Sequence, residues 1–198
     1  VASNILHISP SETMRLCQQL YQTGYITYMR TESTKYAKPF IQEISKHIEE
    51  EYGSEKYIGD VDELENKQAN NPHEAIRVTQ LITKSISSDD TRLVSMYKLI
   101  WKNTMESCMS DAKYKSIPLE ISGPEKTKYT YTHEIPIFLG WKAVNDKKLD
   151  TNTQNEANGL HMFFKTQVSK PIKYNWIESI VSMKNKHTHY TEASLINK

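Results

Sequence analysis

Apolar residues recur at helical spacing in three stretches of the first half of the chain, which predicts three helices. The first follows the capping box Ser9-Pro10-Ser11-Glu12 and reaches about Thr23, where Gly24 supplies the left-handed residue that ends it. The second and third are expected over residues 39–52 and 90–108. Their predicted core positions include Met14, Cys17, Leu20, Tyr21, Phe40, Ile41, Ile44, Ile48, Leu93, Met96, Tyr97, Trp101, Met105 and Cys108.

The second half of the chain changes to short alternating runs of apolar and polar residues, which are typical of strands. Between the second and third helices, residues 54–71 are polar and without period, and they predict a poorly ordered loop. The whole pattern predicts an α+β protein with helices first and strands after. The predicted strands lie at 116–121, 129–131, 160–168 and 174–183, with turn signals at Gly123-Pro124 and Asn158-Gly159.

Composition alone does not identify a partner. The 198 residues carry 25 Lys and Arg against 24 Asp and Glu, so the formal net charge of +1 gives no overall basic field that would indicate nucleic acid. The two cysteines, Cys17 and Cys108, lie in apolar helical patterns that suit small buried thiols, and there is no ligand set for zinc. Mean hydropathy is −0.66 and no apolar run is long enough to cross a bilayer, so we expect a soluble, intracellular protein without a membrane partner.

One short stretch, G-Y-I-T-Y-M-R-T-E-S at residues 24–33, combines apolar residues with a tyrosine and an arginine. If it is extended, Tyr28 and Arg30 project from the same face while Thr27 and Met29 point the other way. A tyrosine oxygen can attack phosphorus, and a guanidinium can bind the non-bridging oxygens and offset the charge that develops on them. By spacing alone a tyrosine is more often a packing or surface residue, so the pair gives a hypothesis of phosphate chemistry.

A second stretch, N-N-P-H-E-A-I-R-V-T at residues 70–79, begins with an N-cap candidate, Asn71, followed by Pro72 at the first helical position. It predicts a short helix. His73 and Arg77 would then lie one turn apart on a common face, near a helix N-terminus that favours anions. Taken alone, a surface turn with one histidine is the more common interpretation of such a segment.

Both stretches resemble the active-site motifs of type IA DNA topoisomerases. The first resembles the family signature, in which the cleaving tyrosine lies at the position of Tyr28 and the assisting arginine at that of Arg30. Methionine at position 29 resembles the bacterial topoisomerase I branch more than the topoisomerase III branch, which usually has proline there. H-E-A-I-R-V-T resembles the motif H-E-A-I-R-P-T, whose histidine and arginine contact DNA near the scissile phosphate. The resemblance implies DNA phosphate contacts from His73, Arg77, Glu74, Thr31 and Ser33.

Two positions depart from these motifs. Val78 replaces the usual proline and loses its fixed φ angle, and Glu32 replaces the usual aspartate. Further along, F-L-G-W at 138–141 resembles an element of the family's β-rich arch, and Y-T-E-A-S-L at 190–195 resembles the segment that opens the next domain. The resemblance thus implies a mostly helical, winged-helix-like catalytic tyrosine domain over 1–114, part of the β-rich arch over 115–184, and the start of the next core domain over 185–198.

By this resemblance the chain is an interior fragment of an isomerase that cleaves and rejoins one strand of single-stranded DNA through a 5′-phosphotyrosine, relaxing negative supercoils without ATP. The Mg²⁺ ligands would lie in a Toprim domain outside this chain, so the fragment is expected to bind no metal and to be inactive without the remaining domains of the same polypeptide. The expected location is cytoplasmic and nucleoid-associated. Two alternatives remain open: a noncatalytic module that binds single-stranded nucleic acid by stacking and phosphate contacts, and a purely structural fragment.

Overall fold

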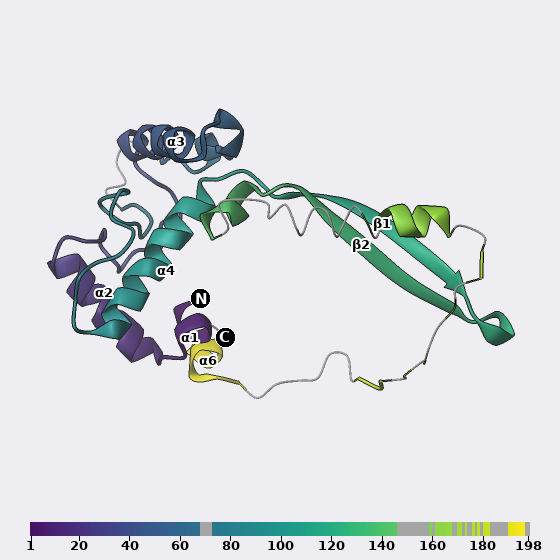
Figure 1. Ribbon diagram of the computed structural model, residues 1–198. Helices are drawn as coiled ribbons and strands as arrows, with labels where there is room; N and C mark the ends of the chain where they lie inside the picture. The colour runs from purple at the N-terminus through teal and green to yellow at the C-terminus, as the bar shows by residue number, and fades with distance from the viewer. Residues whose placement is uncertain are drawn as a thin grey trace. The chain divides into compact units, whose positions relative to one another are not determined.

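The computed structural model describes residues 1–67, 73–145, 161–167 and 190–196, together with positions 159, 170, 171, 173, 176, 178 and 180–182. The chain, shown in Figure 1, divides into two compact units. The first contains Val1–Asp111, Gly140–Lys147 and Tyr190–Lys198, and the second contains Ala112–Leu139 and Lys148–His189. Helices in the first unit and a β-hairpin in the second confirm the mixed α and β class. The winged-helix likeness, the arch and the domain limits at 114 and 184 remain predictions.

The three predicted helices of the first unit begin and end close to the predicted residues. The Oγ of Ser9 accepts a hydrogen bond from the backbone N–H of Glu12 at 3.2 Å and so caps α2 (Pro10–Gln22), and Gly24 just beyond this helix has a φ of 76°. The reciprocal half of the capping box is absent, because both carboxylate oxygens of Glu12 accept hydrogen bonds from Arg15 at 2.8 Å. Further helices of this unit are α1 (Ala2–Leu6), α3 (Lys38–Tyr52), α4 (Thr91–Ser107) and α6 (Glu192–Ile196).

The core of the first unit lies where α2, α3 and α4 bury their apolar stripes. The prediction that Met14 and Tyr21 of α2 lie in the core is wrong, because each side chain is 40% exposed. The buried stripe of α2 runs through Leu16, Cys17 and Leu20, and at 100° per residue Met14 and Tyr21 both fall beyond its Cys17 edge, on the same side. Fully or almost fully buried side chains of the core are Leu16, Leu20, Ile26, Ile44, Ile48, Val78, Met96, Tyr97, Met105 and Cys108.

The loop predicted after α3 is present but is not poorly ordered over residues 54–67. Its backbone bonds to the end of α4: Gly59 N–H donates to the carbonyl of Cys108 at 2.9 Å, and Ser110 N–H donates to the carbonyl of Tyr57 at 2.9 Å. A loop tied to a helix end in this way satisfies backbone groups that would otherwise need water. The rest of the predicted loop, 68–71, lies outside the described residues.

The second unit contains a long antiparallel hairpin formed by β1 (Lys113–Ser122) and β2 (Lys128–Phe138). The predicted turn at Gly123-Pro124 connects them through a short 3₁₀ turn, Pro124–Lys126. Leu119 pairs with Tyr131 and Ile117 with His133, so alternate residues of both strands form one apolar face. The two predicted strands nearest this turn are therefore confirmed, and both are longer than the sequence pattern indicated.

The predicted strand at 160–168 is wrong for the residues that are described there, because 161–166 are helical. Three adjacent apolar side chains, Met162 to Phe164, break the period of two that a strand needs. Phe164 packs against Tyr131 with ring centroids 6.4 Å apart. Of the strand predicted at 174–183, only positions 176, 178 and 180–182 are described, and these lie in no strand.

Candidate active site

The two motif segments, 24–33 and 73–79, lie side by side and are joined by backbone hydrogen bonds. Ile26 and Val78 form an isolated antiparallel bridge, and both side chains are buried. On either side of the bridge, Thr27 N–H donates to the carbonyl of Arg77 at 2.9 Å, and Thr79 N–H donates to the carbonyl of Tyr25 at 3.0 Å. The tertiary structure thus brings together two polar motifs that are about 50 residues apart in the sequence.

These bonds replace the helix predicted from Asn71 and Pro72. Residues 73–77 are not helical, and the two predicted capping residues lie outside the described residues. The segment instead bonds to distant backbone, since Ala75 N–H donates to the carbonyl of Lys35 at 2.7 Å. Pairing between distant segments of the chain depends on tertiary contacts, which a local capping signal cannot predict. In the stretch 24–33, which was considered as extended, only Ile26 is paired as in a strand.

Thr27 is the side chain that links the two motifs most directly. Its Oγ1 donates a hydrogen bond to the carbonyl of Ala75 and accepts one from the backbone N–H of Arg77, both at 3.0 Å. Met29, two positions later, is only 5% exposed, so both residues point inward as the alternation predicted. The sequence analysis assigned Thr27 no role, although an inward-facing hydroxyl signals that a partner must be present in the interior.

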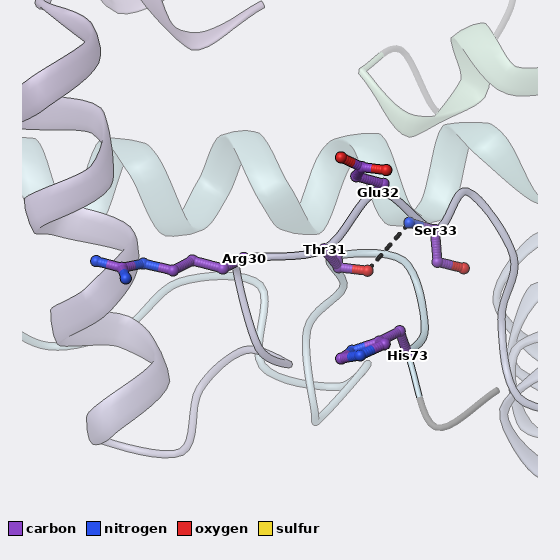
Figure 2. A pocket seen from close by; sticks show the side chains of 5 residues that line it. All are labelled: Arg30, Thr31, Glu32, Ser33 and His73. Carbon is purple, nitrogen blue, oxygen red and sulfur yellow. Dashed lines mark hydrogen bonds between the residues drawn. The ribbon is translucent and has the colours of Figure 1, made fainter.

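Next to this junction lies an open cleft of about 740 Å³, lined among the described residues by Arg30, Thr31, Glu32, Ser33 and His73. Figure 2 shows Thr31, Ser33 and His73 gathered together, whereas the Arg30 side chain extends away from the other four. The Thr31 hydroxyl accepts a hydrogen bond from the backbone N–H of Ser33 at 3.0 Å, which fixes the turn. Four of the predicted site residues therefore line one cleft, and Glu32 adds a carboxylate to it.

Tyr28 lies at the surface just before the cleft-lining residues and is not itself among them. Its side chain is 41% exposed, and its ring packs edge-on against Tyr21 of α2 with centroids 5.1 Å apart. That contact holds the ring from one side while solvent reaches the other. The structure therefore leaves the proposed nucleophile accessible to a large substrate.

Other tyrosines of the first unit are less suited to attack a phosphate. Burial raises the pKa of Tyr97 to about 12, and the hydroxyl of this side chain donates to the carbonyl of Thr83 at 2.7 Å. Burial also raises the pKa of Tyr36, whose hydroxyl bonds to the Ser107 hydroxyl at 3.0 Å. A buried phenol with a raised pKa resists losing its proton and is out of reach of a polymer. Exposure therefore distinguishes Tyr28 from these two candidates.

The two predicted arginines have different surroundings. The Arg77 guanidinium binds Glu74 in a bidentate pair, with Nε–Oε2 and Nη2–Oε1 distances of 3.0 and 3.1 Å. Its third nitrogen donates to the carbonyl of Val78 at 3.1 Å, and its central carbon lies 4.0 Å from the ring centre of Phe40. Arg30 is exposed, and its side chain makes no hydrogen bond or ion pair with the part of the chain that the structure describes. Arg30 is thus available to an anion, whereas Arg77 is already paired.

A second open cleft of about 540 Å³ shares Glu32 and Ser33 with the first and is also lined by Lys35 and Lys67. Both clefts mix acidic and basic side chains. Within the described residues no three His, Cys, Asp or Glu side chains gather as metal ligands. No helix in the described ranges is both long and apolar enough to cross a membrane.

Comparison with known proteins links the chain to one family. A family model described as DNA topoisomerase matches residues 1–198. DNA topoisomerase 1 of Buchnera aphidicola from Acyrthosiphon pisum is 31% identical over 198 residues, covering 98% of this chain and 22% of that protein. The prokaryotic-type DNA topoisomerase 1 of Acanthamoeba polyphaga mimivirus is 31% identical over 96% of this chain and 24% of its own length. Full-length topoisomerase I from Thermotoga maritima is similar in structure, with a TM-score of 0.60 and 27% identity over 76% of this chain and 26% of that one. The chain thus spans about a quarter of the length of these relatives.

Proposed function

The chain belongs to the DNA topoisomerase family that its sequence matches over residues 1–198, and from this premise we propose that it carries the DNA-cleaving tyrosine of a type IA enzyme. The proposed reaction cleaves and rejoins one DNA strand and relaxes negative supercoils. The observation that supports it best is the convergence of two distant motifs on one cleft, which Arg30, Thr31 and Ser33 line from one segment and His73 from the other.

In the proposed reaction the hydroxyl oxygen of Tyr28 attacks a phosphorus atom of single-stranded DNA. The new bond joins the tyrosine oxygen to the 5′-phosphate, the bond from phosphorus to the 3′-oxygen breaks, and the 3′-oxygen takes up a proton as a free hydroxyl. Religation is the reverse attack, by the 3′-hydroxyl on the phosphotyrosine. One phosphodiester is exchanged for another in each direction, so no ATP is needed.

The cleft-lining side chains would bind the phosphate during this exchange. The Arg30 guanidinium carries a permanent charge without a partner among the described residues, so it can bind non-bridging oxygens as charge develops on them. Thr31, Ser33 and His73 would add weaker contacts from the same cleft and fix the strand relative to Tyr28. Such contacts to the backbone position a strand without reading its sequence.

No three ligand-type side chains gather among the described residues, and in our proposal the metal and the other groups that assist proton transfer come from other domains of the same polypeptide. We therefore expect the isolated chain of 198 residues to leave no covalent adduct on DNA. A phenol hydroxyl is a weak acid, so the attacking oxygen needs a neighbouring group that takes up its proton.

Covalent capture tests the proposal directly. The full-length protein is incubated with labelled single-stranded DNA and Mg²⁺ and then denatured, and the adduct is measured for wild type, Tyr28→Phe and Tyr21→Phe. Tyr21 is a matched control because its exposure of 40% is close to the 41% of Tyr28 and the two rings touch. Tyr28→Phe should lose the adduct but keep noncovalent binding, and Tyr21→Phe should keep both. A normal adduct yield in Tyr28→Phe would refute the assignment, and no adduct in wild type would favour a noncatalytic binding module.

A further inference from the structure

The ion pair between Glu74 and Arg77 is held in place from several sides. The side chain of Arg77 is only 16% exposed and that of Glu74 24% exposed. A carboxylate oxygen of Glu74 also accepts a hydrogen bond from the backbone N–H of Ala37, the N-cap of α3, at 3.4 Å. A negative charge at a helix N-terminus is favourable, so the helix stabilises the carboxylate that holds the arginine.

Arg77 also contacts the first turn of α3 through its guanidinium plane, which stacks on Phe40 at 4.0 Å. Stacking on an aromatic face and a bidentate carboxylate pair are the two arrangements in which arginine is not replaceable by lysine. Backbone and side chain of Arg77 therefore both act as connectors. The backbone bonds to Thr27, and the side chain bonds to Glu74 and to the carbonyl of Val78.

The hydrogen bond from Arg77 to the carbonyl of Val78 constrains a position where the related motif has proline. Val78 lacks the fixed φ of proline, yet its side chain is fully buried and the residue is bridged to Ile26. The 3.1 Å bond from Arg77 Nη1 to its carbonyl adds a constraint beside that bridge. The segment that begins at His73 is thus fixed by the bridge to Ile26 and by this side-chain bond instead of by proline.

We propose that Glu74 and Arg77 are positioning residues: they anchor the backbone of 73–78 to α3 and so hold His73 in the cleft, and Arg77 contacts no DNA phosphate. This inference rests on the proposed function and assigns the motif arginine a role different from the DNA contact that the family resemblance implies. Arg30 remains the phosphate-binding arginine. The difference follows from the surroundings: the charge of Arg77 is paired with Glu74, three of its five N–H groups are bonded, one face lies on Phe40 and the side chain is only 16% exposed.

The salt dependence of DNA binding separates the two roles. Binding to single strands weakens with salt by about 0.7 in the logarithmic slope for each phosphate contact. Arg77→Ala in the full-length protein should leave the affinity for a single-stranded oligonucleotide and its salt slope unchanged. The cleavage rate at saturating DNA should fall between about tenfold and a hundredfold, because a small displacement of a catalytic group has that effect. Arg30→Ala should reduce the slope by about 0.7.

The chain offers a close control in Arg15→Ala. Arg15 also forms a bidentate pair with a glutamate three residues earlier, with both distances 2.8 Å, but its side chain is 53% exposed and it lines neither cleft. This variant should match wild type in rate, affinity and slope. The double variant Glu74→Ala/Arg77→Ala should lose no more activity than the more impaired single variant, because the two residues act through one pair.

Three results would overturn the inference: a slope reduced by about 0.7 in Arg77→Ala, an unchanged cleavage rate in Arg77→Ala, or additive losses in the double variant. If Arg77→Ala does not fold, Arg77→Lys decides, since lysine keeps a phosphate contact but cannot form the fork to Glu74. A rate near wild type in Arg77→Lys overturns the positioning role, and a lowered rate supports it. Absence of a wild-type adduct would refute the proposed function instead, so the two failures are distinguishable.

Discussion

Replacing Thr27 by valine should loosen the junction of the two motifs without changing the shape of the side chain. The Thr27 hydroxyl donates to the carbonyl of Ala75 and accepts from the N–H of Arg77, both at 3.0 Å. Valine removes both bonds and leaves the Arg77 N–H facing a methyl group. We expect the segments 24–33 and 73–79 to separate more easily and cleavage by the full-length protein to slow.

The structure sets the size of this effect. Each hydrogen bond contributes about 1 kcal/mol net, and a donor left without a partner in a partly buried place adds a further cost. The free energy of opening this junction should therefore fall by about 2 kcal/mol. Because 1.4 kcal/mol is about tenfold in an equilibrium constant, the population of the open form should rise about thirtyfold.

Hydrogen exchange followed by mass spectrometry measures that opening in the full-length protein. The backbone amides of Thr79 and of residue 27, which bond across the junction, should exchange about thirtyfold faster in Thr27→Val. Thr104→Val is the matched control, because Thr104 is fully buried but its hydroxyl donates only to the carbonyl of Ile100 in its own helix, at 2.8 Å. It should leave the exchange of the two junction amides unchanged. A change below about threefold in Thr27→Val would show that other contacts hold the segments together.

Two further predictions concern Arg30 and Cys108. Arg30→Ala should slow cleavage by about a hundredfold or more, because a charged contact to the transition state contributes several kcal/mol. Arg30→Lys should restore only part of the rate. Single-turnover cleavage equal to wild type in both variants would place Arg30 outside the site. Burial raises the pKa of the Cys108 thiol from 9.0 to about 11, so its contribution to stability is complete well below pH 9 and decreases as pH rises, by about 2 kcal/mol between pH 9 and pH 11. Urea unfolding of wild type and Cys108→Ala at both pH values checks this, and equal pH dependence in the two proteins would contradict it.

Much of the first unit is predictable because its signals are local. Ser9 caps α2 through the N–H of Glu12, and Asp90 caps α4 through the N–H groups of Arg92 and Leu93. Gly53 ends α3 with a φ of 71°. A cap or a left-handed glycine acts within a few residues of itself, so the sequence contains all the information that it needs. The hairpin of the second unit is predictable for the same reason, from alternation and a turn.

The sequence by itself determined the family, the three longest helices of the first unit and the identity of the residues that converge near the cleft, since motif and period are both properties of short stretches. Only the tertiary structure decided what each of these residues is able to do. Pairing with residues 25–27 replaced the helix predicted at 73–79, and the surroundings made Arg77 a connector while leaving Arg30 exposed. The physical reason is that a backbone amide or a guanidinium binds whichever acceptor lies nearest in space, and the nearest acceptor depends on the packing of the whole unit.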